Sequence, residues 1–418
     1  MSDLRVVVVG GGVVGLACAW ELAQGGAQVT VVERDRIGAG VSFGNTGWIC
    51  PSITYPLPAP GLVREGIKQL VTRGDAFVMR PRANPTFARW LWSFTRASSP
   101  KRYADGMRAL LDLNRRTVPL YDRLRDSGVE FEMHANGLVV AATTREGLDF
   151  YKTMTVFLHE HGFEGEVAEL DADEAVAIEP ALAGGKVRWA LHAKLDRYVR
   201  PESLTAGLAE ALRRGGAEVR EGFAVDGFER RNGGIRVHGT EELEADRIVV
   251  AAGLGSVGLL RGLGVSMPLV GARGYSVTLG GGGTPPSHAL YLAEAKLGLS
   301  AYDTGVRLAG VFELGAKTAT APRGALRKLL NGVDTYLPAW RPEPAKESDV
   351  WAGLRPATAD GLPLIGAVPG MEGLYVAAGH TMLGVTLAPS TAAVLAPLVL
   401  RGERMPELAP FDPGRRAP

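Results

Sequence analysis

Residues Leu4 to Arg34 read LRVVVVGGGVVGLACAWELAQGGAQVTVVER. The opening valine run is continuous, as in a strand that is buried on both faces. It leads into glycines spaced as G-x-G-x-x-G, then into an apolar segment of helical character, Leu16–Ala23, and a second strand, Gln28–Val32. The stretch therefore predicts a β-α-β unit with a glycine-rich turn between the first strand and the helix.

Each residue type in this unit suits a bound dinucleotide. Gly10 permits a tight turn, Gly12 lets the backbone approach a pyrophosphate, and Gly15 lets the helix pack closely on the strand. The helix N-terminus offers unpaired N–H groups to phosphates. Glu33 follows the second strand and can accept hydrogen bonds from ribose hydroxyls, which argues against a 2′-phosphate and hence against NADP. The unit predicts a dinucleotide site without distinguishing FAD from NAD.

The bulk composition is that of an ordinary soluble protein. The 418 residues are 46% hydrophobic and 22% charged, and the net charge of +1 gives no reason to expect nucleic-acid binding. Cys18 lies within the first predicted helix and Cys50 is the other cysteine, so we expect no structural disulfide and a reducing compartment. No apolar run reaches the length that a membrane span needs, and we expect a cytoplasmic protein without a signal peptide.

Later segments divide into two kinds. Val219–Glu229, Ile235–Thr240 and Arg247–Ala252 continue the α/β pattern, whereas Leu269–Leu279 and Leu290–Leu314 alternate like antiparallel strands. We predict a Rossmann-like cofactor domain from residues 1–61, 193–268 and 345–418. An inserted substrate domain built on an antiparallel sheet would comprise residues 62–192 and 269–344. Within that domain, residues 102–128 predict one long amphipathic helix, and residues 129–142 a hairpin that turns at Asn136-Gly137.

Residues 62–102 have a local positive charge, with nine basic and two acidic residues and five bulky aromatic ones. A basic, aromatic segment is compatible with peripheral contact to anionic lipid on the inner face of the cell membrane. A solvated, arginine-rich helical face is the alternative, and both interpretations stay open.

The sequence carries none of the common motifs for nucleophilic or metal-assisted catalysis. It has no G-x-S-x-G, H-E-x-x-H, C-x-x-C or P-loop pattern, and its seven histidines form no ligand spacing. We expect no metal. An enzyme of this kind would leave the difficult chemical step to its cofactor and use its own residues to position the substrate.

Several motifs occur in a distinctive order. They are GNTGWICPSITYPLPAPG at 44–61, AAG at 251–253, GYSVTL at 274–279, WAGLRPATADGLPLIG at 351–366 and GHTMLGVTLAPS at 379–390. Together they resemble the FAD-dependent D-amino-acid oxidase superfamily, most closely its bacterial D-amino-acid dehydrogenases. The resemblance covers nearly the whole chain. It implies the glutathione-reductase-type flavoprotein fold, α/β plus α+β, with non-covalent FAD.

The resemblance also implies roles for individual residues. Arg355 matches the arginine that binds the substrate carboxylate, and only a guanidinium offers a planar bidentate fork for that group. Tyr275 and Tyr55 are candidates to line the pocket, and His380 to border the substrate. The implied cofactor-binding residues are Gly10, Gly12, Val13, Val14, Gly15, Glu33, Arg34, Ser42, Asn45, Thr46, Gly47, Ile49, Val225, Ala252, Gly253, Gly353, Gly379, His380, Leu383, Gly384, Val385 and Thr386.

The implied reaction is the oxidative deamination of a D-amino acid to a 2-oxo acid and ammonia, by hydride transfer from Cα to flavin N5. Electrons would pass to a quinone or another non-oxygen acceptor. The alternatives are a glycine-, sarcosine- or proline-type amine oxidase that uses oxygen, and a non-catalytic flavin-binding electron-transfer subunit. Asn45-Thr46-Gly47-Trp48 and Thr381-Met382 depart from the family pattern by adding bulk, so a smaller or cyclic substrate such as D-proline or a hydroxyproline is a further option. Read without the resemblance, Arg355 is a loop arginine paired with Asp360, and the tyrosines and His380 are ordinary buried residues.

Overall fold

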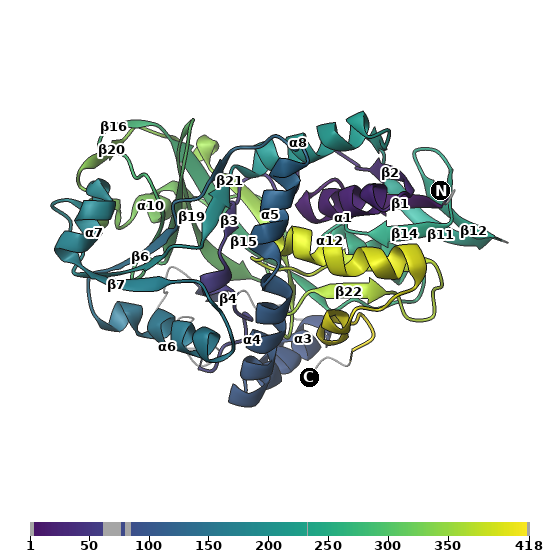
Figure 1. Ribbon diagram of the computed structural model, residues 1–418, viewed down its shortest axis with the longest axis horizontal. Coiled ribbons are helices and arrows are strands. Elements are labelled where there is room, and N and C mark those ends of the chain that lie inside the picture. Colours follow the sequence, from purple (N-terminus) through teal and green to yellow (C-terminus); the bar gives the residue numbers. More distant parts are fainter. Residues whose placement is uncertain (1–3, 62–76, 80–84, 232, 416–418) are drawn as a thin grey trace.

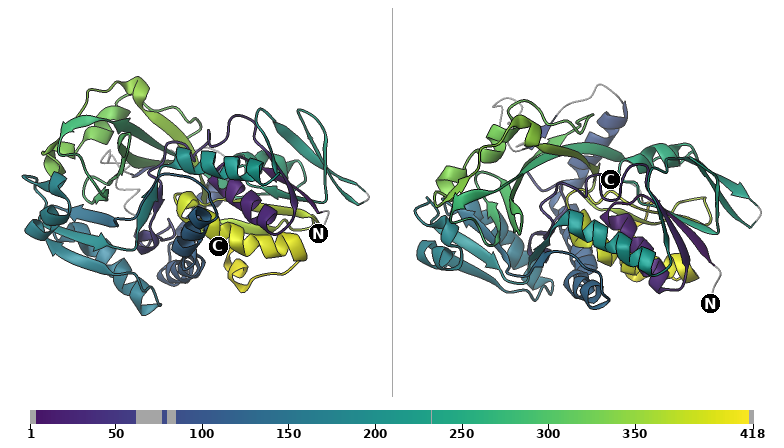
Figure 2. Two further views of the ribbon diagram at one scale, coloured as in Figure 1. Left: turned by 45° about the horizontal axis from the view of Figure 1, so that its top comes forward. Right: turned by 90° about the horizontal axis from the view of Figure 1, so that it is seen from above.

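A computed structural model describes residues 4–61, 77–79, 85–231 and 233–415. The molecule has two halves, each built on its own large β-sheet, with long helices between and around them (Figure 1). The first and last parts of the chain both lie in the half that contains β1, α1 and α12 (Figures 1 and 2).

The first half is a six-stranded sheet whose central strands are parallel. Its strand order is β10 (Glu218–Arg220), β2 (Gln28–Val32), β1 (Arg5–Val9), β14 (Arg247–Val250), β23 (Leu374–Ala378) and β22 (Leu364–Ala367). Only β22 at the edge is antiparallel to its neighbour. β1 lies at the centre of the sheet, and Val6 to Val9 are all buried, as the continuous valine run predicted.

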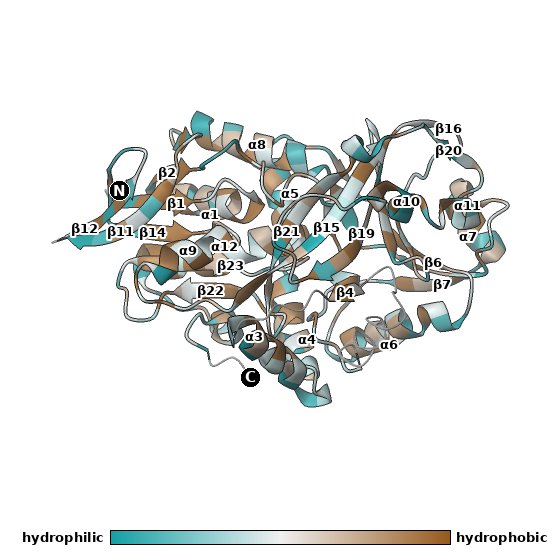
Figure 3. Cartoon of the chain, turned by 180° about the vertical axis from the view of Figure 1, so that it is seen from behind, coloured by the Kyte–Doolittle hydropathy of each residue, from teal (hydrophilic) through white to brown (hydrophobic). Residues whose placement is uncertain are grey.

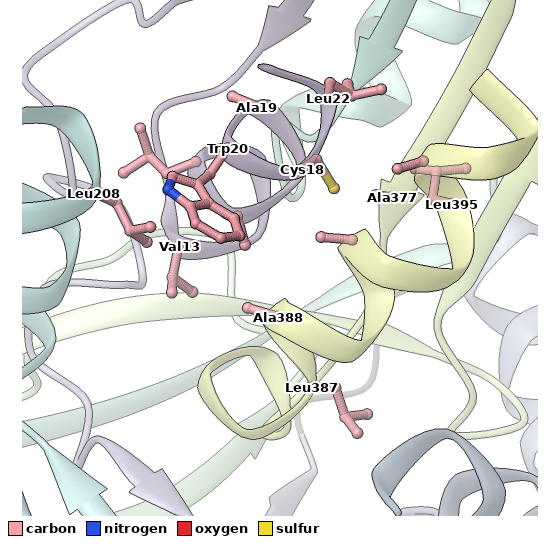
Figure 4. Packing of buried hydrophobic residues seen from close by; sticks show 14 of the residues in the cluster. Val13, Cys18, Ala19, Trp20, Leu22, Leu208, Ala377, Leu387, Ala388 and Leu395 are labelled. Atoms are coloured by element: carbon pink, nitrogen blue, oxygen red, sulfur yellow. The ribbon is translucent and has the colours of Figure 1, made fainter. Parts of the chain in front are cut away.

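Helices cover one face of this sheet. α1 (Val13–Gln24) packs against α12 (Gly384–Arg401) and α8 (Pro201–Arg214). Figure 4 shows buried residues of this cluster, in which Cys18 of α1 lies on the side that faces α12. Cys18 is fully buried there, and burial raises the pKa of its thiol to about 12, so the thiol stays protonated. The other face packs on a small sheet of β11 (Val225–Arg231), β12 (Gly234–Gly239) and β13 (Leu243–Ala245), and on α9 (Gly255–Arg261).

One helix in the described part of the chain, α12, is long and apolar enough to cross a membrane by length and composition. The expectation that no apolar run has this length is therefore wrong. In the fold, 67% of α12 is buried against its neighbours, because it is the central helix of the first half. Its length and apolar character are thus accounted for by packing inside the protein.

The second half is a nine-stranded, largely antiparallel sheet. Its strand order is β21 (Trp351–Thr358), β15 (Leu269–Leu279), β19 (Gly305–Leu314), β18 (Leu297–Tyr302), β17 (Ala289–Leu292), β6 (Leu138–Ala142), β8 (Trp189–Ala193) and β7 (Val167–Asp171), with β4 (Phe77–Met79) paired to β19. Two further small sheets comprise β16 (Gly281–Gly283) with β20 (Trp340–Pro342), and β3 (Trp48–Ile49) with β9 (Arg197–Val199) and β5 (Met133–His134). The predicted fold class is confirmed.

The two faces of the nine-stranded sheet differ in character. One face is a hydrophobic core in which Val277, Leu290 and Leu308 pack beneath α7 (Ala172–Ile178), α10 (Ala325–Leu330) and α11 (Val333–Tyr336). The opposite face, here called the site face, presents the small residues Gly274, Ser276, Gly298 and Ser300. The hydroxyl of Ser276 donates to the carbonyl of Gly44, and the Trp48 indole donates to Ser300 Oγ at 2.9 Å. The loop of residues 43–48 therefore lies across the site face.

Helices α3 (Pro85–Ala97), α4 (Pro100–Asn114), α5 (Thr117–Asp126) and α6 (Glu146–Glu160) complete the fold. The single long helix predicted over 102–128 is in fact two, α4 and α5, separated near Arg115. Pro119 explains the break, since it has no N–H to donate to the carbonyl of Arg115. The predicted hairpin at Asn136-Gly137 is wrong as well: the turn is present, but β5 pairs with β9 while β6 pairs with β8 and β17.

The aromatic residues of α3 divide between core and solvent. Phe87, Trp90 and Phe94 are buried and stack in sequence, whereas Trp92 is 57% exposed with Arg96 over its ring. Much of the basic stretch 62–102 lies outside the described residues, so contact with a membrane stays a prediction. The predicted domain boundaries also stay a prediction. β21 belongs to the nine-stranded sheet, although its residues fall in the segment expected to form the cofactor domain.

Candidate active site

A long cavity of about 650 Å³, here called the site cavity, lies between the two halves. One end is lined by the glycine-rich turn after β1, by Glu33 and Arg34 after β2, and by Val225. The other end is lined by Trp351–Pro356 of β21 and by Gly379–Met382, which leads into α12. The volume is within the usual range for a cofactor pocket.

The glycine-rich turn has the geometry that its sequence predicted. Gly10 adopts φ +115°, and a Cβ there would overlap the backbone of Ala251. A Cβ at Gly15 would overlap the carbonyl of Gly10, which explains the close helix–strand contact. At Gly12, by contrast, a Cβ would approach only the Ser42 hydroxyl, at 3.2 Å. Gly12 therefore exposes its backbone to the cavity, and Gly15 serves packing without lining it.

Glu33 is held in place by backbone N–H groups. Its carboxylate accepts hydrogen bonds from Gly11 N at 2.8 Å and from Asp35 N at 3.0 Å. Each carboxylate oxygen can accept a further hydrogen bond, and Glu33 lines the cavity. This arrangement fixes an acceptor pair at the end of β2, where the sequence predicted a ribose site.

Only some of the predicted residues in the loop of residues 42–49 line the cavity. Ser42 and Asn45 line the cavity: Ser42 Oγ accepts from Val13 N at 3.0 Å, and Asn45 Oδ1 accepts from Gly47 N at 2.7 Å. Thr46, Gly47 and Ile49 are not among the lining residues. The Thr46 carbonyl accepts from Ser300 and Tyr302, and a Cβ at Gly47 would overlap the Val199 carbonyl. Ile49 is fully buried.

Arg355 lies at the far end of the cavity, half-buried in β21. Its guanidinium lies on the site face over Gly274, where a Cβ would overlap it. It donates to the Val311 carbonyl at 3.3 Å and lies 5.8 Å from the centre of the Phe312 ring. Burial lowers the pKa of the guanidinium to about 10, which still leaves it charged at neutral pH.

No carboxylate of the described residues pairs with Arg355. Asp360, the partner expected of a structural arginine, is engaged by Arg415 through two hydrogen bonds of 2.8 and 3.0 Å. A desolvated cation without a counter-ion is costly unless an anion arrives to compensate it. The cavity therefore offers a ready site for an anionic group at this end.

His380 also lines the cavity but is 5% exposed. One ring nitrogen is 2.9 Å from the Thr391 hydroxyl, and burial lowers the pKa of the imidazole to about 4. The ring is therefore neutral at physiological pH. Its backbone forms an isolated bridge with Ala357, and the next residue, Thr381, adopts φ +53° and donates to the Pro356 carbonyl. This loop is thus tied to β21 beside Arg355.

The two tyrosine candidates do not line the cavity. Tyr275 is 1% exposed and packs with Val277 and Leu279, on the face of β15 opposite to Gly274 and Ser276. Tyr55 packs among hydrophobic residues with its ring 5.2 Å from that of Phe150, and burial raises the pKa of its phenol. Strand alternation explains Tyr275, because successive side chains point to opposite faces.

The start of α12 completes the far end of the cavity. Gly379, Gly384 and Val385 line it, whereas Leu383 is the N-cap residue and Thr386 donates to the Trp48 carbonyl at 2.8 Å. The positive end of the α12 dipole therefore faces the cavity. Of the remaining predicted cofactor residues, Ala252, Gly253 and Gly353 line it too.

Several lining residues were not predicted. Trp351 is the clearest, since its ring packs where a Cβ of Gly44 would lie and its centre is 6.4 Å from that of Phe43. Its place at the head of the W-A-G-L-R-P motif was a usable signal. The others are Val9, Val32, Asp35, Ala39, Gly40, Val41, Phe223, Asp226, Ala251, Leu254, Gly255, Gly258, Leu259, Ala319, Ala352, Leu354, Pro356, Ala377, Ala378, Thr381 and Met382. No spacing in the sequence links these distant segments.

A group of potential metal ligands lies outside the cavity lining. Atoms of Glu132, His134 and Asp303 that could bind a metal lie within 4.8 Å of one another. His134 and Glu132 already form a hydrogen bond of 2.9 Å, and the Glu132 carboxylate also accepts from Asp303 N. The sequence missed this group because Asp303 is remote from the other two residues.

Comparison with known proteins agrees with this geometry. The family model described as DAO, FAD dependent oxidoreductase, matches residues 5–398. The chain belongs to this family. It is therefore an FAD-dependent oxidoreductase, and the expectations of an enzyme and of FAD are confirmed. The residues around Gly12, Glu33 and the start of α12 fit that cofactor, with backbone N–H groups and carboxylate oxygens facing the cavity.

Relatives of known name extend over the whole chain. The D-amino acid dehydrogenase of Cereibacter sphaeroides is 32% identical over 432 residues, which cover 99% of this chain and 97% of the relative. That of Methylobacterium nodulans is 32% identical, with 98% of each chain covered. Among solved structures, glycine oxidase from Geobacillus kaustophilus is similar at 25% identity, with a TM-score of 0.76 and 99% of both chains covered. L-proline dehydrogenase from P. horikoshii shares the fold at 20% identity, with a TM-score of 0.72 and 99% and 97% coverage.

Proposed function

We propose that the protein oxidises a D-amino acid to the 2-oxo acid and ammonia through an imino acid, and passes the electrons to a quinone or another non-oxygen acceptor. The observation that carries the proposal is the guanidinium of Arg355, which faces the site cavity without a carboxylate partner in the described chain. The relatives that align with this chain over nearly their whole length are named D-amino acid dehydrogenase. Their name supports the choice of substrate.

The amino acid carboxylate supplies the anion that Arg355 lacks. Nη1 is partly engaged by the Val311 carbonyl, so the remaining N–H groups can hold two carboxylate oxygens in a fork. In a partly desolvated site, such a charge-assisted pair is worth about 1.5–3 kcal/mol. Anchoring the carboxylate fixes the position of Cα, which reduces the entropy cost of reaching the reactive geometry.

The bound FAD supplies the redox chemistry, by accepting a hydride from Cα of the substrate. The chain's own residues have to admit the substrate as a neutral amine, because no protein base is evident at this end. The described titratable residues that line the Arg355 end are Arg355 and His380. Arg355 stays charged, and burial lowers the pKa of His380 to about 4, which makes its neutral imidazole a weak base. The N-terminus of α12 favours the negative charge that accumulates nearby during reduction.

The side-chain preference follows from residues near Arg355. Of the residues that depart from the family pattern by adding bulk, Thr381 and Met382 line the cavity, and Met382 is 45% exposed. Trp48 instead directs its indole to Ser300. A flexible methionine adapts to varied side chains, so we include small, cyclic and apolar D-amino acids in the proposed range, D-proline among them.

Anaerobic mixing with a panel of amino acids tests the proposal. The flavin absorbance should bleach with D-amino acids but not with their L-enantiomers. Bleaching by glycine or sarcosine alone, followed by rapid reoxidation in air, would instead identify an amine oxidase that uses oxygen. No bleaching by any amino acid or secondary amine would contradict the proposal and favour a non-catalytic flavin-binding subunit.

A further inference from the structure

A second cavity of about 620 Å³, here called the rear cavity, adjoins the site cavity. It is enclosed by α9, by the loop that follows it, by the first residues of β15, by the segment after β19 and by the start of α3. Figure 3 views the whole molecule from behind and labels α9, α3, β15 and β19. Leu254 and Leu354 line both cavities.

The two cavities share the side chains of Leu254 and Leu354, which lie close to Gly271 of β15. Gly271 shows this, because a Cβ there would meet the Leu254 side chain at 3.2 Å, the Leu354 side chain at 3.5 Å and the Ala316 carbonyl at 3.1 Å. These three neighbours therefore converge on one point of β15. Electron transfer through protein weakens steeply with distance, so an electron acceptor has to bind in a cavity that borders the site cavity, as the rear cavity does.

The lining of the rear cavity combines apolar side chains with polar ones, among them Thr86 and Ser266, and with two cationic ones. Val257, Met267 and Val270 supply apolar surface. Arg261 and Lys317 are exposed, and neither forms an ion pair with a described residue. The described lining includes no acidic residue. A ligand with an apolar body and electron-rich oxygens complements these features.

We propose that the rear cavity binds the electron acceptor as a quinone ring, with its carbonyl oxygens directed towards Arg261 and Lys317. This inference rests on the proposed function, which needs an acceptor other than oxygen. Negative charge grows on the quinone oxygens as electrons arrive, and two nearby cations stabilise that charge more than they stabilise the neutral quinone.

The electrons and protons of this oxidation and reduction balance. Oxidation of the amino acid to the imino acid releases two electrons and two protons, and FAD carries the electrons. One quinone takes up both electrons. It also binds two protons, which it can take from water at the open mouth, and becomes one quinol while the cofactor returns to its oxidised form.

Binding can be measured on the oxidised holoenzyme, where no turnover occurs. The probe is a water-soluble ubiquinone analogue with a short side chain, titrated by calorimetry. The double variant Arg261→Gln/Lys317→Gln removes the cations, and Val257→Phe fills the apolar part. Lys101→Gln is the matched control, because Lys101 lies on the exposed side of α4, paired with Asp105. We expect each test variant to bind the quinone about tenfold more weakly or worse, and the control to bind like the wild type.

Kinetics then separate this inference from the proposed function. Bleaching of the flavin by a D-amino acid should keep its rate in all variants, while reoxidation by the quinone slows about tenfold in the two test variants. Unchanged quinone affinity in Val257→Phe and in the double variant would overturn the inference, as would the absence of quinone binding to the wild type. Failure of D-amino acids to bleach the flavin would instead contradict the proposed function, and the calorimetric titration does not depend on that result.

Discussion

The two ends of the site cavity are assembled in different ways. Around Glu33 the lining comes largely from residues 9–45, whose glycines leave room for a ligand, and it is completed by Phe223, Val225 and Asp226. Around Arg355 the lining comes from β21, which pairs with β15, and from the loop before α12, and these segments are far apart in the sequence. The first end depends on local geometry and the second on the register of strands. Substitutions at the two ends should therefore have separable effects on cofactor and on substrate.

Arg355→Lys should have the largest effect. An ammonium cannot reproduce the planar fork, so we expect KM for the D-amino acid to rise about 100-fold, with FAD content unchanged. Steady-state kinetics at saturating acceptor measure this change. Arg415→Lys is the control, because that arginine pairs with Asp360 outside the cavity lining. An unchanged kcat/KM in Arg355→Lys would exclude Arg355 from carboxylate binding.

Gly274→Ala should come next. Its new methyl group would overlap the Arg355 guanidinium and force it out of position, at a cost of about 1–3 kcal/mol. We expect binding of an unreactive carboxylate such as benzoate to weaken about 10- to 100-fold, as read from the flavin spectrum. Gly282→Ala is the matched control, since a Cβ there meets no atom within 4 Å. Equal affinities of the two variants for benzoate would show that carboxylate binding does not depend on the position of the guanidinium above Gly274.

His380 should make stability depend on pH. Its pKa is lowered to about 4 in the folded protein, so the unfolded chain binds the proton more readily. The stability associated with the neutral ring is complete above about pH 6.5 and is lost as the pH falls towards 4, by up to about 3 kcal/mol. Urea unfolding of the wild type and of His380→Asn, at pH 7.5 and pH 4.5, should show a smaller loss in the variant. His238→Asn, at an exposed site, should behave like the wild type.

Glu33→Gln should have the smallest effect, and it concerns the other end of the cavity. An amide keeps the size of the side chain but weakens the hydrogen bonds to Gly11 N and to a ribose, so we expect FAD to bind about 5- to 10-fold more weakly. With FAD at saturation, KM for the amino acid should match the wild type. Glu218→Gln is the control. A rise in substrate KM for Glu33→Gln would show that the two ends are coupled.

The same contrast explains which features the sequence could predict. Gly10, Gly12, Gly15 and Glu33 act within one β-α-β unit, so their spacing alone predicts their geometry. Arg355 was recognised from its motif, but its support by Gly274 depends on the pairing of β21 with β15, which spacing does not encode. Tyr275 follows Gly274 directly and was assigned to the pocket, yet strand alternation turns it to the opposite face.

Pairing between strands that are distant in the sequence also explains why the hairpin prediction was wrong and why several residues that line the site cavity were not predicted. Asn136-Gly137 has a strong turn signal, and Gly137 does adopt φ +89°, but the strand before it pairs with β9. Trp351 and Leu254 line the same cavity, although they are nearly a hundred positions apart in the sequence. Only the folded chain shows which face of each strand is presented there.

The position of helix α4 determines how the two halves of the molecule unfold. Leu110 and Leu113 belong to the core around α12, whereas Met107 and Leu111 belong to a cluster with residues of α6. One helix thus forms part of the interior of both halves, and neither half can melt without exposing apolar surface of the other. Heating should therefore give a single cooperative transition. Because α12 borders the site cavity, occupation by FAD should raise the melting temperature of the whole molecule, including the half that carries the nine-stranded sheet.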